Sequence, residues 1–399
     1  MTARLIILSS PIFTSTEAVT DEDVTMIIRP VAITDLPSLQ QIAVESGPGF
    51  TSLVDDCDFL TRKIDRSLAS FARTVTSPGD ESYLFVLEDS ETGEIMGTTG
   101  IEASVGTRRP LYHYHRSLVV HHSPELNLHR RMEVLNMCNH YTGCSEICTL
   151  FLRPRFRRAQ AGKLLSRVRF LFMAQHPQRF AETVIAEMRG VSNESGQSPF
   201  WNWLRAHFVD LDFDTVTRMV GTGDNGFIAD LMPRHPLYTQ LMDESARAVI
   251  GQVHDNTRPA LNMLEAEGFR HTGYIDLFDG GPSVEARLHD IRSVSTSAGC
   301  RIQVVDDVQP ALEKWNGGGR GRTLVITNTG TADFRATVTS AAKYLPARNL
   351  LQVPRTLANT LQLGNDGHAR FTELATTSTD RQRAAIPMNQ KKEALHAHR

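Results

Sequence analysis

The sequence predicts an α+β fold in which a mixed central sheet, with insertions, is flanked by helices. An apolar run at residues 147–152 is short and rich in β-forming residues, and it leads through a basic turn into an amphipathic segment. Two further apolar runs, 83–87 and 94–105, are joined by turn residues and predict an antiparallel hairpin. Beyond residue 293, short strands separated by Gly, Asn and Asp predict a small β-barrel-like domain.

Composition limits the classes of function. The chain has 399 residues, which suggests two or three domains. Its 42 Lys and Arg residues nearly balance 45 Asp and Glu residues, so no bulk attraction to nucleic acid or membrane is implied. The five unevenly spaced cysteines indicate a reducing compartment, and we expect a cytoplasmic protein. No apolar run reaches the roughly 18 residues that span a bilayer, and residues 5–12 lack the cleavage site of a signal peptide.

The N-terminal half predicts a regular succession of elements. Residues 1–25 are rich in Ser, Thr, Asp and Glu and are expected to be a disordered extension, with Met26 as an alternative start of translation. The elements expected after it are a strand at 27–29, helices at 34–44 and 58–73, the hairpin, a strand at 111–122 and a helix at 132–139.

The C-terminal half first continues the alternation of strands and helices, and beyond residue 292 the sequence predicts short strands alone. The elements expected up to residue 292 are a strand at 183–188, helices from Ser198 and Asp243, a helix at 256–267 closed by Gly268, and strands at 274–278 and 284–288. We therefore expect a main domain at 26–292 and a small β-rich domain at 293–375, which includes a flexible loop at 317–321. The remaining residues, 376–399, lack apolar periodicity and predict a disordered tail.

The basic turn after the strand at 147–152 is a candidate anion site. Arg155, Arg157 and Arg158 precede a helical segment whose apolar residues recur at spacings of three and four. The first N–H groups of a helix lack partners within the helix, and the helix dipole favours negative charge there. The ligand that best fits such a site is the pyrophosphate of a nucleotide cofactor. A solvated basic helix end is the alternative interpretation.

This turn resembles the GCN5-related acyl-CoA N-acyltransferase superfamily. The superfamily pattern Arg/Gln-x-x-Gly-x-Gly/Ala corresponds to residues 157–162, so the resemblance implies that Arg157, Arg158 and Gly162 bind the pyrophosphate of CoA. Gln160 departs from the pattern, because a glycine normally lets phosphate approach the chain at that position. The helix at 256–267 and the Gly-Phe pair after it resemble the last helix and strand of the same fold.

A longer resemblance, from about Met26 to about Val353, is to the arginine N-succinyltransferase family. It rests on seven collinear segments: 83–102, 142–153, 186–191, 198–201, 227–238, 249–254 and 274–282. The resemblance implies transfer of the succinyl group of succinyl-CoA to the α-amine of L-arginine in arginine catabolism. It further implies succinyl-CoA as a co-substrate with no permanently bound cofactor, and a homo-oligomer or a pairing with a similar subunit.

The same resemblance implies roles for two residues. His254 corresponds to the family's proton donor, and a histidine suits protonation of a leaving thiolate near neutral pH. Leu150 corresponds to a succinyl-CoA contact, and the backbone of a strand residue can pair with pantetheine amides or polarise the thioester carbonyl. From the residues alone, His254 also fits a surface histidine before a helix, and Leu150 is equally a core leucine.

Arginine as acceptor requires carboxylates for its guanidinium group. Four candidates lie in or beside the expected active-site strands and turns: Glu102, Glu146, Glu187 and Asp230. The sequence does not choose among them, and each also fits a solvated or structural charge.

Other functions remain open at this point. Cys138, His140, Cys144 and Cys148 are ligand types for zinc, but their spacing fits no common zinc finger and Cys148 falls in an apolar strand, so no metal is expected. An alternative hypothesis for the reaction is transfer of a different acyl group, or transfer to another amine such as ornithine. A non-catalytic or regulatory subunit is the alternative of another class. Three departures from the family keep it open: Gln160 in the phosphate turn, Arg116-Ser117, and the segment 127–130.

Overall fold

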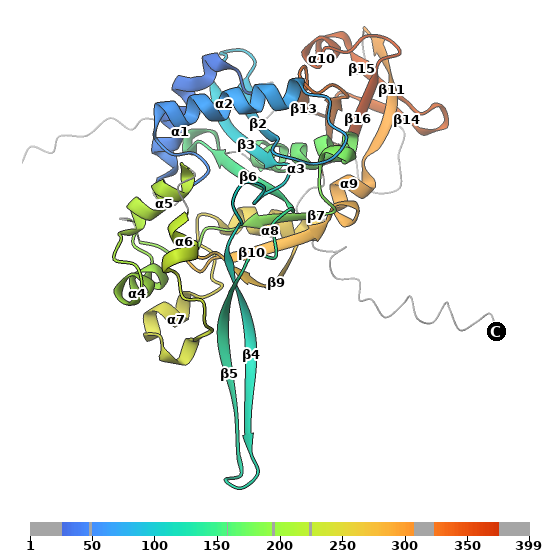
Figure 1. The fold of residues 1–399 in the computed structure, drawn as a ribbon. Helices are drawn as coiled ribbons and strands as arrows, with labels where there is room; N and C mark the ends of the chain where they lie inside the picture. The colour runs from blue at the N-terminus through green and yellow to red at the C-terminus, as the bar shows by residue number, and fades with distance from the viewer. Residues whose placement is uncertain are drawn as a thin grey trace, which may run out of the picture.

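The computed structural model describes residues 26–47, 50–157, 159–193, 196–222, 226–306 and 323–374. The expected N-terminal extension, the loop at 317–321, the C-terminal tail and Arg158 lie outside the described residues. Figure 1 shows a body of sheet and helices from which one long hairpin, β4 (His113–Ser123) and β5 (Leu128–Cys138), projects.

The strands of the described residues join into one sheet of sixteen, in the order β14-β15-β11-β16-β12-β13-β1-β2-β3-β6-β7-β10-β9-β4-β5-β8. The other fourteen strands are β1 (Met26–Pro30), β2 (Ser82–Asp89), β3 (Ile95–Glu102), β6 (Ser145–Leu152), β7 (Thr183–Glu187), β8 (Leu237–Tyr238), β9 (Arg270–Ile275), β10 (Pro282–Arg287), β11 (Ala298–Val305), β12 (Leu324–Asn328), β13 (Ala336–Thr339), β14 (Lys343–Leu345), β15 (Leu350–Pro354) and β16 (His368–Glu373). The pairs β6–β7 and β11–β15 are parallel and the others antiparallel, so the expected mixed sheet is confirmed.

The helices begin and end at residues that suit these positions. They are α1 (Leu36–Ser46), α2 (Cys57–Ala72), α3 (Ala159–Gln175), α4 (Pro199–His207), α5 (Phe213–Gly221), α6 (Gly226–Leu231), α7 (Glu244–Val249), α8 (Arg258–Glu267), α9 (Arg292–Thr296) and α10 (Arg355–Thr360). The predicted start of α4 is confirmed, since the Ser198 side chain accepts from the Trp201 N–H, and α8 ends at Gly268 with φ 109°. None of the described helices combines the length and apolar composition of a membrane span.

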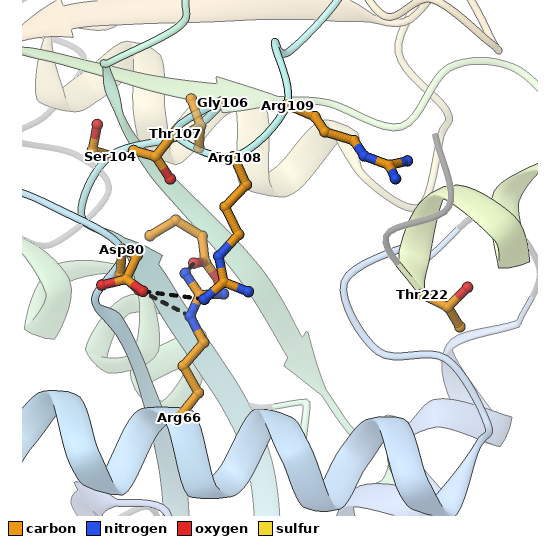
Figure 2. A pocket seen from close by; sticks show the side chains of 10 residues that line it. Arg66, Asp80, Ser104, Gly106, Thr107, Arg108, Arg109 and Thr222 are labelled. Atoms are coloured by element: carbon orange, nitrogen blue, oxygen red, sulfur yellow. Dashed lines mark hydrogen bonds and ion pairs between the residues drawn. The ribbon is translucent and has the colours of Figure 1, made fainter. Parts of the chain in front are cut away.

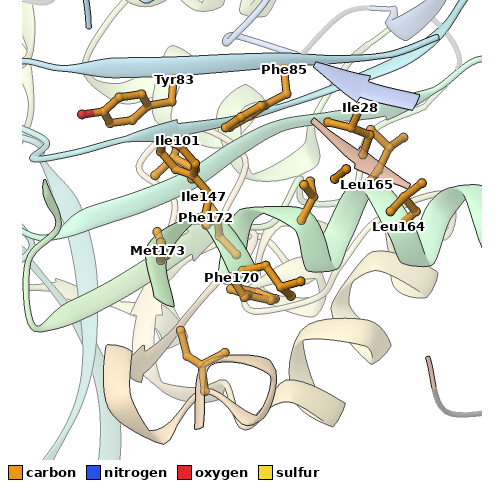
Figure 3. Close-up of a cluster of buried hydrophobic side chains, with 14 of the residues drawn as sticks. Ile28, Tyr83, Phe85, Ile101, Ile147, Leu164, Leu165, Phe170, Phe172 and Met173 are labelled. Carbon is orange, nitrogen blue, oxygen red and sulfur yellow. The ribbon is translucent and has the colours of Figure 1, made fainter. Parts of the chain in front are cut away.

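Helices cover both faces of the sheet around β2. Tyr83, Phe85 and Leu87 belong to the cluster that α3 completes, and the alternate residues Leu84 and Val86 pack with α1 and α2. Figure 3 shows the first of these faces, with Tyr83 and Phe85 directed toward α3. The buried apolar residues of α3 are Ala161, Leu164, Leu165, Val168, Phe170, Leu171, Phe172 and Met173, and the polar Ser166, Arg167 and Arg169 are buried with them. The helix predicted from their spacing is therefore confirmed.

Helix α2 is fixed to β2 by two serines. The Ser67 hydroxyl accepts from the Leu84 N–H (2.9 Å) and the Ser70 hydroxyl from the Ser82 N–H (3.0 Å). These buried N–H groups lie beyond the end of β1 and would otherwise lack a partner. Because Lys63 lies one turn before Ser67, the same face of α2 also directs Lys63 toward β3, where its ammonium group is 3.5 Å from Glu102.

The C-terminal strands extend the sheet beyond β1. Ile28 of β1 is in register with Ala336 of β13, and the Phe334 ring packs edge-on against Phe172 of α3, with centroids 5.1 Å apart. Strands β11, β12, β15 and β16 and helix α10 enclose a second cluster of buried side chains that includes Ile302 and Leu351.

One predicted helix is wrong. Residues 132–139 fall in and just beyond strand β5, which pairs with β4 from His113↔Cys138 to Ser123↔Leu128. Met, Glu and Leu in this segment have high helix propensity, but pairing with an adjacent β-forming strand overrides that preference. Asn127, with φ 47°, closes the hairpin in a backbone conformation that asparagine tolerates.

The predicted strand at 274–278 is also displaced. Strand β9 ends at Ile275, and the following residues turn because the Asp276 carboxylate accepts from the backbone N–H groups of Phe278 (2.7 Å) and Asp279 (2.8 Å). An aspartate that captures the N–H groups after it favours a turn over a strand.

Replacement of the buried Leu165 by alanine should lower the free energy of unfolding by about 2–5 kcal/mol, because it leaves a cavity between α3 and the sheet. Leu241→Ala is the matched control, since Leu241 is 78% exposed and its replacement should change stability by less than about 0.5 kcal/mol. Urea unfolding followed by circular dichroism measures both. Equal effects of the two changes would contradict the placement of α3 in the core.

Candidate active site

Strands β6 and β7 are paired over only a short stretch. Their parallel register contains Ser145↔Val184 and Glu146↔Ile185, although β6 continues to Leu152. On its other side, β6 stays paired with β3 as far as Gly97↔Leu152. From Ile147 onward, the edge of β6 that faces away from β3 therefore has no strand partner in the described part of the chain. Its backbone N–H and C=O groups are available to a ligand that runs along the strand.

A bulge lies in this one-sided part of β6. Thr149 and Leu150 together stand opposite Thr99, and Thr149 has φ 54°, which is unusual for a β-branched residue. Gly100 leaves room for the bulge, because a Cβ there would lie 3.2 Å from Thr149 Oγ1 and 3.4 Å from Cys148 Sγ. A bulge re-aims the backbone groups beside it and is often found next to active sites. Leu150 lies at this bulge, with its side chain packed against the core.

The turn after β6 holds two of the expected CoA-binding residues near the same strand end. The exposed Arg157 donates from Nε to the Leu152 carbonyl (3.4 Å). Gly162, in the first turns of α3, has open space where a Cβ would project. The third expected residue, Arg158, is outside the described residues.

Arg153 shows that the cations of this turn serve different purposes. Its nearly buried guanidinium donates to the Glu45 carboxylate (2.7 Å) and to Glu94 (3.2 Å), which fastens the turn to α1 and β3. Arg155 also pairs with Glu94. Arg153 is therefore structural. Arg155 and Arg157 are both exposed, and Arg157 is the one that pairs with no carboxylate among the described residues.

His254 lies at the carboxyl end of β7. Its N–H donates to the Arg189 carbonyl (2.9 Å), and the preceding Val253 bridges to Gly190, so residues 253–254 run beside the continuation of β7. The Asn256 N–H donates to His254 Nδ1 (3.1 Å), which leaves the ring proton of the neutral imidazole on Nε2. Partial burial and the Arg189 charge lower the pKa of His254, so the ring is neutral at physiological pH.

Leu150, Arg157, Gly162 and His254 therefore share one edge of the sheet. The carboxyl ends of parallel strands meet at the same edge, and ligands of α/β proteins commonly bind there. The sequence places Leu150, Arg157 and Gly162 on one continuous segment, whereas the structure adds His254 from about a hundred residues further along the chain.

Three glutamates form a row across neighbouring strands. Glu102 of β3 is in register with Glu146 of β6, and Glu146 is in register with Ile185, two residues before Glu187 of β7. Because side chains alternate along a strand, Glu102, Glu146 and Glu187 share one face of the sheet. We refer to them as the acidic row. Of the four sequence candidates, Asp230 is not in the row, since it is exposed on α6.

Glu146 and Glu187 of the acidic row have raised pKa values, so they are protonated more readily than an exposed glutamate. Burial, with smaller contributions from the charges of Glu102 and Asp276, raises the pKa of Glu146 to about 7 against the lowering effect of Lys63. Burial and the neighbouring Asp276, Glu146 and Asp279 raise the pKa of Glu187 well above its ordinary value. Glu102 instead has cations at hand, with Arg66 Nη2 at 2.9 Å and Lys63 at 3.5 Å.

A compact turn ties these groups to His254. The Asp279 carboxylate accepts from the N–H groups of Gly190 (2.7 Å) and Gly281 (2.8 Å), and the Gly280 carbonyl accepts from the Gly251 N–H (2.8 Å). A Cβ on Gly190 would lie 2.6 Å from the Asp279 carbonyl, so only glycine fits this approach. The turn fixes the segment that carries Arg189 and His254.

Sequence reasoning missed Lys63, Arg189, Asp276 and Asp279. Arg189 lies in the segment 186–191, and both aspartates lie in 274–282, which are two of the segments that carry the family resemblance. That signal was present, but assigning a role required the contacts of the folded chain.

A cavity of about 430 Å³ opens beside Glu102. It is lined by Arg66, Asp80, Glu102, Ser104, Val105, Gly106, Thr107, Arg108, Arg109 and Thr222. Figure 2 shows the side chains of Arg66 and Arg108 converging near Asp80, and the contacts are Arg108 Nη2 to Asp80 (3.3 Å) and Arg66 Nε to the Asp80 carbonyl (2.9 Å). The cavity is thus polar, with its charges largely engaged in pairs.

The cysteine- and histidine-containing segment at 138–148 does not assemble a metal site in the described part of the chain, where no three metal-ligating side chains come together. Burial raises the pKa of Cys148 to about 12, with Glu146 and Glu102 adding to the effect. Its thiol therefore stays protonated at neutral pH and is unsuited to nucleophilic attack.

Comparison with known proteins shows the family to which the chain is similar. Residues 26–293 match the family model described as arginine N-succinyltransferase beta subunit. The chain is 45% identical over 290 residues to arginine N-succinyltransferase of Enterobacter sp. (strain 638), covering 73% of this chain and 83% of that one. It is 44% identical over 315 residues to the Salmonella typhi protein of the same name, covering 79% and 89%.

A solved structure is similar over a larger share of the chain. It is that of arginine/ornithine succinyltransferase subunit AI from Pseudomonas aeruginosa, with a TM-score of 0.78 and 35% sequence identity. The similarity covers 88% of this chain and 100% of that one.

The titration of Glu146 tests the geometry of the acidic row. We expect its carboxyl to titrate near pH 7 in the ¹³C NMR spectrum of labelled protein, with the signal identified by its loss in Glu146→Gln. Lys63→Met should raise that pKa further, because it removes the nearby positive charge. Glu91→Gln, in an exposed turn, is the control and should leave the Glu146 signal in place. An ordinary Glu146 pKa near 4 would contradict the buried placement.

Proposed function

The chain belongs to the arginine N-succinyltransferase family, and from that membership we propose that it transfers the succinyl group of succinyl-CoA to the α-amine of L-arginine. The products are N2-succinylarginine and CoA, as the succinyltransferase route of arginine catabolism requires. The observation that carries the proposal is the acidic row, in which Glu146 lies near the start of β6 and Glu187 at the end of β7, because a guanidinium acceptor needs recessed carboxylates near the reacting amine.

We propose that residues 26–292 form a GCN5-related acyl-CoA N-acyltransferase domain and that residues 293–375 form a small barrel-like β domain. The separation of β6 from β7, the bulge at Thr149 and the helix that follows β6 support the first part. The separate buried cluster of the C-terminal strands supports the second. Hydrogen exchange tests the division, since separate domains should open with different free energies.

For succinyl-CoA, we propose that pantetheine runs along the one-sided part of β6 and that the pyrophosphate meets the start of α3. Arg157, Arg158 and Gly162 would hold the pyrophosphate, and the Leu150 backbone N–H would bond the thioester carbonyl oxygen. A bulge supports this role, because it turns N–H groups out of the ladder. CoA serves here as a co-substrate, with no permanently bound cofactor.

For L-arginine, we propose that the guanidinium lies against Glu146 and Glu187. Two recessed carboxyls with raised pKa values repel each other when both are ionised, and a bound cation relieves that repulsion. Binding should therefore lower both pKa values and release protons near neutral pH. The acceptor then lies across β6 and β7, beside Leu150 and the segment that carries His254.

The reaction is a direct transfer within a ternary complex. The α-ammonium group loses a proton, and the free amine attacks the thioester carbonyl, whose developing oxyanion is stabilised by the Leu150 N–H. As the C–S bond breaks, the Nε2–H of the neutral His254 donates a hydrogen bond to the departing thiolate sulfur. The thiolate takes up the proton that the nitrogen loses on becoming an amide, so the products are an amide and a free thiol and the imidazole is unchanged.

Release of the CoA thiol from succinyl-CoA tests the function. We expect release that depends on L-arginine and is much weaker with acetyl-CoA or with L-ornithine. Release with another donor or amine would retain the acyltransferase chemistry and replace the named substrate. A folded protein that releases no thiol with any pair would instead favour a non-catalytic subunit.

We further propose that the chain acts in the cytoplasm as part of an assembly with a second, similar chain. All five cysteines are free thiols, which suits a reducing compartment, and cell fractionation tests the location. Strand β4 meets β9 only at Tyr114 and His115, so the outer part of the hairpin extends from the body with two strands alone. Such a hairpin is marginally stable by itself, and it exposes large apolar side chains: Leu118 (60%), Val120 (53%), Leu126 (69%) and Leu128 (48%).

Leu118→Glu tests that assembly. If a second copy covers the hairpin, light scattering after size-exclusion chromatography should show a multimer for the unchanged chain and a monomer for Leu118→Glu, because a charge is costly in an apolar contact. Val44→Glu, at an exposed site of α1 away from the hairpin, should remain multimeric. A multimer that survives Leu118→Glu would contradict the hairpin contact, and a monomeric unchanged chain would leave only a different subunit as partner.

His254→Ala should lower kcat about 10²- to 10⁴-fold, since it removes the donor to the leaving sulfur, while the KM for both substrates changes little. His289→Ala, at an exposed position, is the control and should keep normal kcat. Because the pKa of His254 is lowered and that of Glu146 in the free chain is about 7, the pH dependence of kcat/KM near neutrality should persist in the Ala variant and disappear in Glu146→Gln. Full activity of His254→Ala would overturn the assigned role.

A further inference from the structure

Arg189 is a recessed cation at the centre of the active-site edge. It follows Glu187 by two residues and shares a backbone hydrogen bond with His254, from the His254 N–H to the Arg189 carbonyl (2.9 Å). Its guanidinium Nη2 donates to Ser192 Oγ (2.9 Å). Its Nε is enclosed and has no hydrogen-bond partner among the residues that the structure describes. An enclosed N–H without an acceptor is uncommon and costly in a folded protein.

The charge of Arg189 lacks a counterion within salt-bridge distance among the described residues. Arg153 pairs with Glu45 (2.7 Å) and Arg167 with Glu267 (3.2 Å). Arg169 and Arg179 are buried without a carboxylate partner among the described residues and donate instead to backbone carbonyls and to hydroxyl groups, and Arg179 Nε is unpaired as well. The carboxylate that acts most strongly on Arg189 is Asp279, whose oxygens already accept from Gly190 and Gly281. Burial lowers the pKa of Arg189, which is the direction expected for a cation held out of water without close compensation.

We propose that Arg189 binds a substrate carboxylate and thereby holds the reacting centre beside His254. A carboxylate would accept from Nε and the adjacent Nη together, the bidentate geometry that a guanidinium offers. Arg189 is then a specificity-determining residue for a ligand with a carboxylate near its reacting carbon. The inference rests on the proposed function, because both of its substrates meet that description.

The carboxylate has two sources in this reaction. The succinyl group ends in a carboxylate close to the thioester carbonyl, and L-arginine carries its α-carboxylate on the carbon that bears the attacking amine. The acidic row is suited to neither of these anions, since it presents Glu146 and Glu187. The Arg66 and Arg108 side chains at the nearby cavity are already engaged with Glu102 and Asp80.

Two pairs of analogues separate these sources in Arg189→Gln. Butyryl-CoA replaces the succinyl carboxylate by a methyl group, and L-argininamide replaces the α-carboxylate by a neutral amide. We expect the unchanged chain to prefer the carboxylate-bearing member of at least one pair by about 10- to 100-fold in kcat/KM. In Arg189→Gln that preference should collapse for the same pair, through a loss confined to the carboxylate-bearing substrate. The pair that collapses identifies the source.

Arg189→Lys should retain part of the preference, because it keeps the charge and loses the fork. Arg287→Gln, at an exposed ion pair with Glu182, is the control and should keep both preferences. Equal loss for both members of both pairs in Arg189→Gln would show a merely structural role and overturn the inference. Retention of both preferences at full activity would overturn it as well.

Calorimetric binding distinguishes failure of this inference from failure of the proposed function. If the unchanged chain shows no turnover, the proposed function fails, and the same analogue pairs can be compared by their dissociation constants in the unchanged chain and Arg189→Gln. A carboxylate preference that Arg189→Gln loses would still support Arg189 as the anion site. Equal affinities for both members of each pair in the unchanged chain would reject it.

Discussion

The early separation of β6 from β7 is the constraint on which the rest of the site depends. Two parallel strands that paired along their full length would use their facing N–H and C=O groups on each other. Here the pairing stops at Glu146↔Ile185, and the bulge at Thr149 redirects the strand beyond that point. The sheet stays intact because β3 remains paired with β6 through Leu152. One edge is thereby freed without the loss of the core beneath it.

The electrostatics of the site follow from the same arrangement. Strands β3, β6 and β7 each contribute one member of the acidic row, and their spacing in the sheet brings three carboxyls together on one face. Cations stand at both ends, with Lys63 and Arg66 beside Glu102 and Arg189 beside His254. Burial of like charges without compensation is costly. The acidic row is therefore stable in the free chain only because Glu146 and Glu187 hold protons readily. A guanidinium is the natural partner for such a site.

Much of the fold could be predicted from the sequence, because the hydrophobic period of α3 and the apolar run of β6 are strong local signals. Strand β5 could not, since its residues favour a helix locally and only pairing with β4 makes them a strand. That Glu187 and not Asp230 joins Glu102 and Glu146 depends on the pairing register of β6 with β7. No pattern in the local sequence reveals that register. Arg189 could not be singled out from the sequence either, because its importance rests on the missing hydrogen-bond acceptor for its Nε among the described residues, and this absence becomes visible only in the folded chain.

A crystal structure with CoA and N2-succinylarginine tests the central claim most directly. We expect pantetheine to lie along β6 beyond Ile147, the amide oxygen of the product to accept from the Leu150 N–H, and the guanidinium to lie between Glu146 and Glu187. Pantetheine bound away from β6, or a guanidinium remote from the acidic row, would contradict it.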